Sequence, residues 1–190
     1  GASVTVGPRR AASEALGGAR DGPRGQECCR GSPHFAWTER WTGSKLSSLV
    51  HDHVPAALGL PEGSVRGDLT DLRVEGRDDS GRLTAVTYET TDGSWRVPGD
   101  RNRWVLRRAD GGILRSTKVE LDVRHAGRRV ADVTAAGSGN GHGVGMCQTG
   151  ALARSRAGQT FREILDAYYP TARLRPLIGS DLPPGRGDAS

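Results

Sequence analysis

The stretch GSGNGHGVGMCQ, residues 137–148, has glycine at every second position from Gly137 to Gly145. Alternating glycines leave one face of an extended backbone without side chains. The other face then carries Ser138, Asn140, His142 and Val144. Glycine this dense is typical of a backbone that closely approaches a ligand or another segment. The run has neither the G-x-G-x-x-G spacing nor the closing Gly-Lys-Ser/Thr of a nucleotide loop. A flexible linker is the alternative, but the His, Met and Cys among the glycines disfavour it.

This run divides a strand-rich region from a pair of helices. Alternating apolar residues and turn signals predict strands at 69–74, 83–90, 95–97, 116–123 and 129–134, and a strand or turn at 37–41. Helices are predicted at 44–57 and, as a short piece, at 101–108. After the run, a helix over 148–157 stops at Gly158, and a capping box from Thr160 to Glu163 opens a second helix that Pro170 ends. The predicted fold is α+β: an antiparallel strand meander packed with a few short helices, two of them after the glycine-rich run.

Length and composition support one domain with unstructured segments at both ends. The chain has 190 residues, 35% hydrophobic and 5% aromatic, which predicts a small core. We expect residues 1–27 to be a disordered or truncated N-terminal segment, with a short helix around 11–16, and the native N-terminus to be missing. Residues 28–178 form the predicted domain, and 179–190 a disordered tail. No apolar run approaches the roughly 18 residues of a membrane span, and no secretory leader opens the chain.

The positive charge of the chain does not by itself identify a partner. The net charge of +5 comes from arginines scattered along the sequence, and such a surface favours polyanions. Aromatic residues are few and no RNP-like pattern occurs, so a nucleic-acid module is not favoured.

Two Cys–His pairs have mirrored spacing. Cys29 precedes His34 by five positions, and His142 precedes Cys147 by five. Two thiolates and two imidazoles suit tetrahedral zinc, and a site with four protein ligands would be structural. The alternative is that the cysteines are small buried side chains or form a disulfide, while the histidines make local hydrogen bonds. A metal role for residues 51–53 is disfavoured, because positions i and i+2 point to different faces of a helix.

Longer motifs resemble a known family. Residues 139–151, Gly158 and residues 163–170 resemble the C-terminal signature of the stage II sporulation protein D / LytB (amidase enhancer) family. Upstream, CRGSPHFAW at 29–37 is similar to the Cys-x-x-Ser-Pro-His-aromatic-x-Trp segment of that family, and LRST at 114–117 matches a shorter piece. The resemblance extends from about Cys28 to Leu174.

The resemblance implies a bacterial protein directed at peptidoglycan. Some members of the family are lytic transglycosylases that cleave glycan strands with one acid/base carboxyl, others enhance a partner amidase, and part of the family holds zinc with Cys and His. The implied location is outside the cytoplasmic membrane, in the cell wall or periplasm. On this basis Asn140, His142 and Gln148 are the predicted substrate-binding residues. Glycan strands are the predicted partner, with a cell-wall amidase as a second one.

One departure from the family affects catalysis. The catalytic Glu of the family lies in a helix far upstream of the Cys-x-x-Ser-Pro-His segment, whereas only 28 residues precede Cys29 here. The sequence around Glu14 resembles the start of that helix, but Gly17 and Gly18 would interrupt a helix here. We therefore expect a truncated, weakly active or inactive relative of the lytic transglycosylases, with Glu14 as a candidate acid. The alternative is a non-catalytic glycan-binding module or amidase enhancer.

Overall fold

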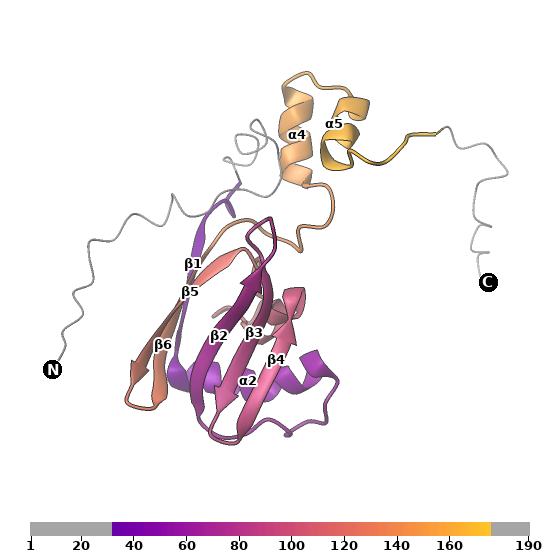
Figure 1. Cartoon of the computed structure of the whole chain (residues 1–190). Coiled ribbons are helices and arrows are strands. Elements are labelled where there is room, and N and C mark those ends of the chain that lie inside the picture. The colour runs from indigo at the N-terminus through magenta and orange to yellow at the C-terminus, as the bar shows by residue number, and fades with distance from the viewer. Residues whose placement is uncertain (1–31, 176–190) are drawn as a thin grey trace, which may run out of the picture.

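Two three-stranded antiparallel sheets and one long helix make up the body of the protein, in a computed structural model that describes residues 32–175 (Figure 1). The first sheet contains β1 (Trp37–Thr42), β6 (Arg129–Gly137) and β5 (Val119–Ala126), in that order. The second contains β2 (Leu69–Arg77), β3 (Leu83–Thr90) and β4 (Gly93–Pro98). Helix α2 (Gly43–Leu58) leads from β1 towards the second sheet. The fold is α+β, as predicted.

The strands fall into two sheets. Strands β2, β3 and β4 form an antiparallel meander, whereas β5 and β6 form a hairpin and β1 pairs with the other edge of β6. The first strand thus pairs with the last, from Trp37 opposite Gly137 to Thr42 opposite Asp132. A 3-10 turn η1 (Gly99–Arg101) and a short helix α3 (Asn102–Val105) carry the chain away from β4, so the helical piece predicted over 101–108 ends early. Strand patterns reveal apolar faces but not distant partners, which is why the sequence did not separate the sheets.

One hydrophobic core joins both sheets and α2. The helix contributes Leu46, Leu49, Val50 and Val54, whose spacing places them on one face. Both sheets contribute fully buried side chains, among them Val86, Tyr88 and Val133. Helix α2 begins after Thr42, whose hydroxyl accepts the backbone N–H of Lys45, and ends at Gly59.

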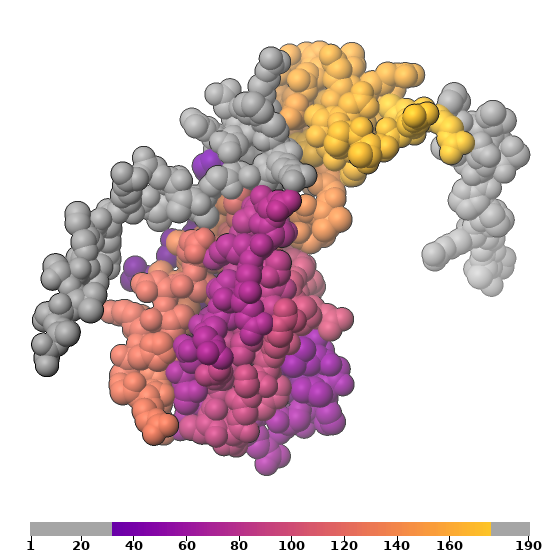
Figure 2. Space-filling view, viewed as in Figure 1, coloured from indigo at the N-terminus to yellow at the C-terminus, as the bar shows by residue number. Residues whose placement is uncertain are grey.

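Helices α4 (Gln148–Arg156) and α5 (Phe161–Tyr168) form a lobe above the strand body (Figure 2). The predicted capping box is confirmed: Thr160 accepts the backbone N–H of Glu163, and the Glu163 carboxylate accepts the backbone N–H of Thr160. Few side chains of the lobe are buried, and Ile164 is the buried apolar residue of α5.

Several predictions concern residues beyond 32–175. The disordered segments at 1–27 and 179–190 and the short helix at 11–16 lie outside the described residues. Within the described range, no helix combines the length and the apolar character needed to cross a membrane.

Candidate functional site at the glycine run

The first half of the glycine run is bound to the body of the protein on two sides. The backbone N–H of Ser138 donates to the carbonyl of Lys118 at 3.0 Å, and that of Gly139 donates to His34 at 2.8 Å. The N–H of Gly141 donates to the carbonyl of Arg115 at 2.7 Å. These bonds hold the run between the segment before β1 and the segment before β5. The loop therefore leaves β6 in a defined position.

Two side chains from distant parts of the sequence hold carbonyls of the run. The indole Nε1 of Trp37 donates to the carbonyl of Gly139 at 2.9 Å. The guanidinium of Arg82 donates from Nη1 to the carbonyl of Gly141 at 3.1 Å and to the Ser116 hydroxyl at 3.0 Å. Sequence reasoning missed Arg82, because it lies just after the β2–β3 turn and no local motif connects it with residue 141.

Burial shapes the electrostatics of Arg82. Its Nε is buried and makes no hydrogen bond within the described residues. Burial lowers the pKa of its guanidinium, and the nearby carboxylates of Asp78 and Asp100 oppose that shift. An arginine stays charged under ordinary conditions, so Arg82 places a positive charge directly beneath the loop.

The run is not an extended ribbon with one bare face. Gly139, Gly141 and Gly143 have φ of +75°, +123° and +77°, a region that residues with a side chain rarely adopt. At Gly143 a Cβ would also lie 2.1 Å from Nε of Arg82. The alternating glycines thus allow a looped backbone that lies against Arg82, and the period of two does not reflect strand geometry.

The three predicted binding residues are all exposed. Asn140 and His142 lie on the loop and Gln148 is the first residue of α4. Within residues 32–175 the amide groups of Asn140 and Gln148 make no hydrogen bond, and no bond joins any two of the three side chains. Nδ1 of His142 accepts the N–H of Val144 at 2.9 Å. The other ring nitrogen, Nε2, is therefore the one left for a ligand. Together they present amide and imidazole groups that can exchange hydrogen bonds with polar ligands.

The second half of the run is tied to the helical lobe. The N–H of Met146 donates to the Tyr169 hydroxyl at 2.9 Å. Sγ of Cys147 accepts the N–H of Gly150 at 3.4 Å, so Cys147 caps α4. Apolar side chains are exposed in this region, namely Val144, Met146, Leu152 and Phe161.

The predicted zinc site is only partly within the described residues. Cys29 lies outside them, and His34, His142 and Cys147 do not form a metal-binding group in residues 32–175. His142 makes the kind of local hydrogen bond that the alternative gives to the histidines, and Cys147 is half-buried at the start of α4. Because one of the four ligands lies outside the described residues, the four-ligand zinc site stays a prediction.

No described residue near the glycine run is identified as catalytic. Glu14 lies outside the described residues. Glu39 of β1 is linked to the run through Arg115, with which it forms an ion pair. The side chain of Glu39 is 15% exposed. This ion pair links the carboxylate in β1 to the segment before β5 that also holds Gly141.

Comparison with known proteins identifies one matching family and two similar proteins. A family model described as a domain of unknown function (DUF8618) matches residues 25–145. An uncharacterised protein of Brachyspira hyodysenteriae is 25% identical over 138 residues, which cover 70% of this chain and 30% of that protein. An amidase enhancer of Bacillus subtilis is 51% identical over 41 residues, which cover 22% of this chain and 6% of the enhancer. The chain therefore spans less than a third of the length of either relative.

Proposed function

This chain belongs to the family of the domain of unknown function DUF8618, and from that premise we propose that it is a cell-wall glycan-binding module that assists an amidase. The observation that carries the proposal is the 51% identity over 41 residues to an amidase enhancer. The proposed location is outside the cytoplasmic membrane, where peptidoglycan lies. Zinc and glycan cleavage remain secondary predictions.

The geometry of the glycine run is suited to binding a glycan strand. Its backbone is held by Trp37 and Arg82, so little conformational entropy is lost when a ligand binds. Asn140, His142 and Gln148 present donors and acceptors to solvent, as sugar hydroxyls and acetamido groups require. The absence of side chains at the glycines lets a chain of sugars approach the backbone closely.

Sedimentation with purified sacculi tests the proposal. We expect the full chain to pellet with sacculi. The double variant Asn140→Ala/His142→Ala should bind roughly tenfold more weakly, because two hydrogen bonds of about 1 kcal/mol each are lost in part to water. His125→Ala is the matched control, since His125 lies in β5 at the end of the sheet remote from the run. Equal loss in the control variant, or no pelleting of the wild type, would contradict glycan binding by the run.

The amidase role is measured in the same samples. A purified N-acetylmuramoyl-L-alanine amidase is added, and the release of stem peptides is compared with and without the chain. We expect faster release with the wild type and a smaller increase with the double variant. Release of anhydro-muropeptides without amidase would instead establish that the chain cleaves glycan itself.

A further inference from the structure

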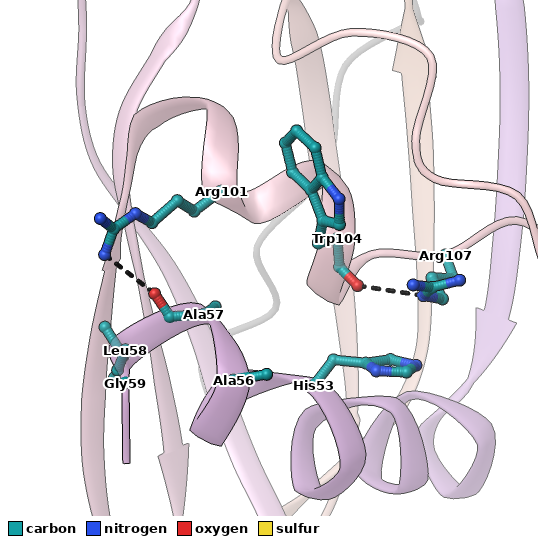
Figure 3. A pocket seen from close by; sticks show the side chains of 8 residues that line it. All are labelled: His53, Ala56, Ala57, Leu58, Gly59, Arg101, Trp104 and Arg107. Atoms are coloured by element: carbon teal, nitrogen blue, oxygen red, sulfur yellow. Dashed lines mark hydrogen bonds between the residues drawn. The ribbon is translucent and has the colours of Figure 1, made fainter. Parts of the chain in front are cut away.

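A second recess lies at the end of α2, away from the glycine run. It has a volume of about 610 Å³ and is open to solvent. Its wall is formed by the last turn of α2 with His53, and by Arg101, Trp104 and Arg107 of the segment after β4. Figure 3 shows Trp104 between the two arginines, with α2 and His53 on the other side of the recess.

The segment that carries Trp104 is firmly attached to the core. Asn102 is fully buried; its amide donates to the carbonyls of Val97 and Gly99, each at 2.9 Å, and its Oδ1 accepts from the Tyr88 hydroxyl at 2.9 Å. Val105 is also fully buried. Trp104, one residue away, keeps 44% of its surface exposed. The Arg103 guanidinium lies over this ring, 5.7 Å from its centroid. A large aromatic ring is thus held at the surface by a rigid support, which is a preorganised arrangement for stacking on its remaining surface.

The lining of the recess carries positive charge and contains no acidic residue. Nη1 of Arg101 donates to the carbonyl of Ala57 at 3.0 Å, and Arg107 donates to the carbonyls of Trp104 and Gly111. Neither arginine forms an ion pair within the described residues, and no acidic residue lines the recess. Backbone carbonyls use only part of the five N–H donors that each guanidinium has.

The end of α2 would by itself disfavour an anion, because carbonyls at a helix C-terminus carry partial negative charge. Arg101 offsets this by bonding Ala57, the residue just before the end of the helix. Burial, followed by the charge of Arg107, lowers the pKa of His53, while the nearby Asp52 carboxylate opposes that shift. This direction favours the neutral imidazole, which can serve as a hydrogen-bonding group.

We propose that this recess binds a carboxylate-bearing pyranose sugar, with the C–H face of the ring on Trp104 and the carboxylate on Arg107, the arginine on the His53 side of the recess. An indole face attracts the weakly positive C–H groups of a pyranose, and guanidinium groups favour planar carboxylates. A neutral sugar would stack on the indole but leave Arg107 without an anion. A simple inorganic anion would bind Arg107 but make no use of the indole.

This site does not share residues with the glycine run, and it does not require the proposed function. The recess lies at the α2 end of the sheets, whereas the run leads from β6 towards α4 at the other end (Figure 1). Loss of binding at one site can therefore be distinguished from loss at the other.

The test is an NMR titration of the ¹⁵N-labelled full chain. N-acetylmuramic acid is compared with N-acetylglucosamine, and glucuronic acid with glucose, so that each pair differs in the carboxyl-bearing group. The chain has four tryptophans, and the indole N–H signal of Trp104 is identified by its disappearance in Trp104→Phe. We expect the acidic sugars to move this signal in a saturable way with Kd on the order of millimolar, and at least tenfold weaker binding of the neutral ones.

Two variants check the assignment. Arg107→Gln, followed through the Trp104 indole, and Trp104→Ala, followed through the backbone amide of Gly59 in the recess, should each weaken binding of the acidic sugars at least fivefold. Arg96→Gln and Phe161→Ala, which alter an exposed arginine and an exposed aromatic elsewhere, should leave it unchanged. Backbone amide spectra report whether each variant is folded. Equal affinity for acidic and neutral sugars, shifts confined to the glycine run, or no shift at Trp104 up to 50-fold above the expected millimolar range would each overturn the proposal.

Discussion

The indole of Trp37 lies over the α-carbon of Gly137, its partner residue in the β1–β6 ladder. A Cβ at residue 137 would lie 2.2 Å from Cζ2 and 2.3 Å from Cη2 of that ring. The same indole donates Nε1–H to the carbonyl of Gly139. One side chain thus both requires the first glycine of the run and fixes the direction in which the run leaves the strand.

We expect Gly137→Ala to destabilise the protein by about 1–3 kcal/mol, the usual cost of adding a methyl group to a packed site. The gain in strand propensity over glycine is smaller, roughly 0.5–1 kcal/mol. The measurement is the urea midpoint of unfolding with an unchanged m-value. Gly145→Ala is the matched control in the same run, because its Cβ would only contact the Tyr169 hydroxyl at 3.4 Å.

A double-mutant cycle shows whether the ring is the cause. Trp37→Phe removes the second ring, to which the two clashing atoms belong. Gly137→Ala should therefore cost less in that background than in the wild type. Equal costs in both backgrounds would contradict the clash.

Local elements were predictable because their signals are local. The capping box from Thr160 to Glu163 and the helix predicted at 44–57 need only neighbouring residues, and both predictions are confirmed. The β1–β6 pairing was not predictable, since a strand pattern does not identify a partner almost a hundred residues away.

The candidate site was only half predictable for the same reason. Glycine density indicated close approach to another segment, and the structure identifies that segment at Arg82 and Trp37. Neither residue has a local signature for this role. The period of two suggested an extended face, whereas positive φ at alternate glycines produces a loop.

Arg82→Met should loosen the loop without unfolding the body. The variant removes the bonds from the guanidinium to Gly141 and Ser116 but fills similar space. We expect hydrogen exchange at the Gly141 amide to accelerate by roughly tenfold, which corresponds to about 1.4 kcal/mol of local stability. Arg129→Met, at an exposed arginine paired with Asp68, is the control. Unchanged exchange at Gly141 would mean that Arg82 does not hold the loop.

Tyr88→Phe should cost about 1–3 kcal/mol of unfolding free energy. The variant leaves Oδ1 of the fully buried Asn102 without its donor, and an unsatisfied buried acceptor keeps its desolvation penalty. Chemical denaturation measures the loss. A change below about 0.5 kcal/mol would show that a water molecule or another donor replaces the hydroxyl.

The same residue predicts loss of stability in alkali. Burial raises the pKa of Tyr88 well above its ordinary value of 10.0. The folded state therefore keeps the proton while the unfolded state releases it, so stability is complete below pH 10 and falls as the pH rises further. Thermal unfolding between pH 9 and 11 in roughly half-unit steps should show a steeper decline in the wild type than in Tyr88→Phe. Parallel declines would contradict the assignment.

Helix α5 should respond to acid through Glu163. The backbone N–H of Thr160, followed by its hydroxyl, donates to the Glu163 carboxylate and lowers its pKa below the ordinary 4.5. The stabilisation of the first turn is thus present above pH 4.5 and is lost as the pH falls through the lower folded pKa. The carboxyl ¹³C shift of Glu163 should titrate below 4.5 in the wild type and closer to it in Thr160→Ala. Thr149→Ala, at an exposed threonine within α4, should leave that titration unchanged. If Thr160→Ala leaves the Glu163 titration where it was, the hydroxyl bond contributes nothing and the backbone N–H alone caps the carboxylate.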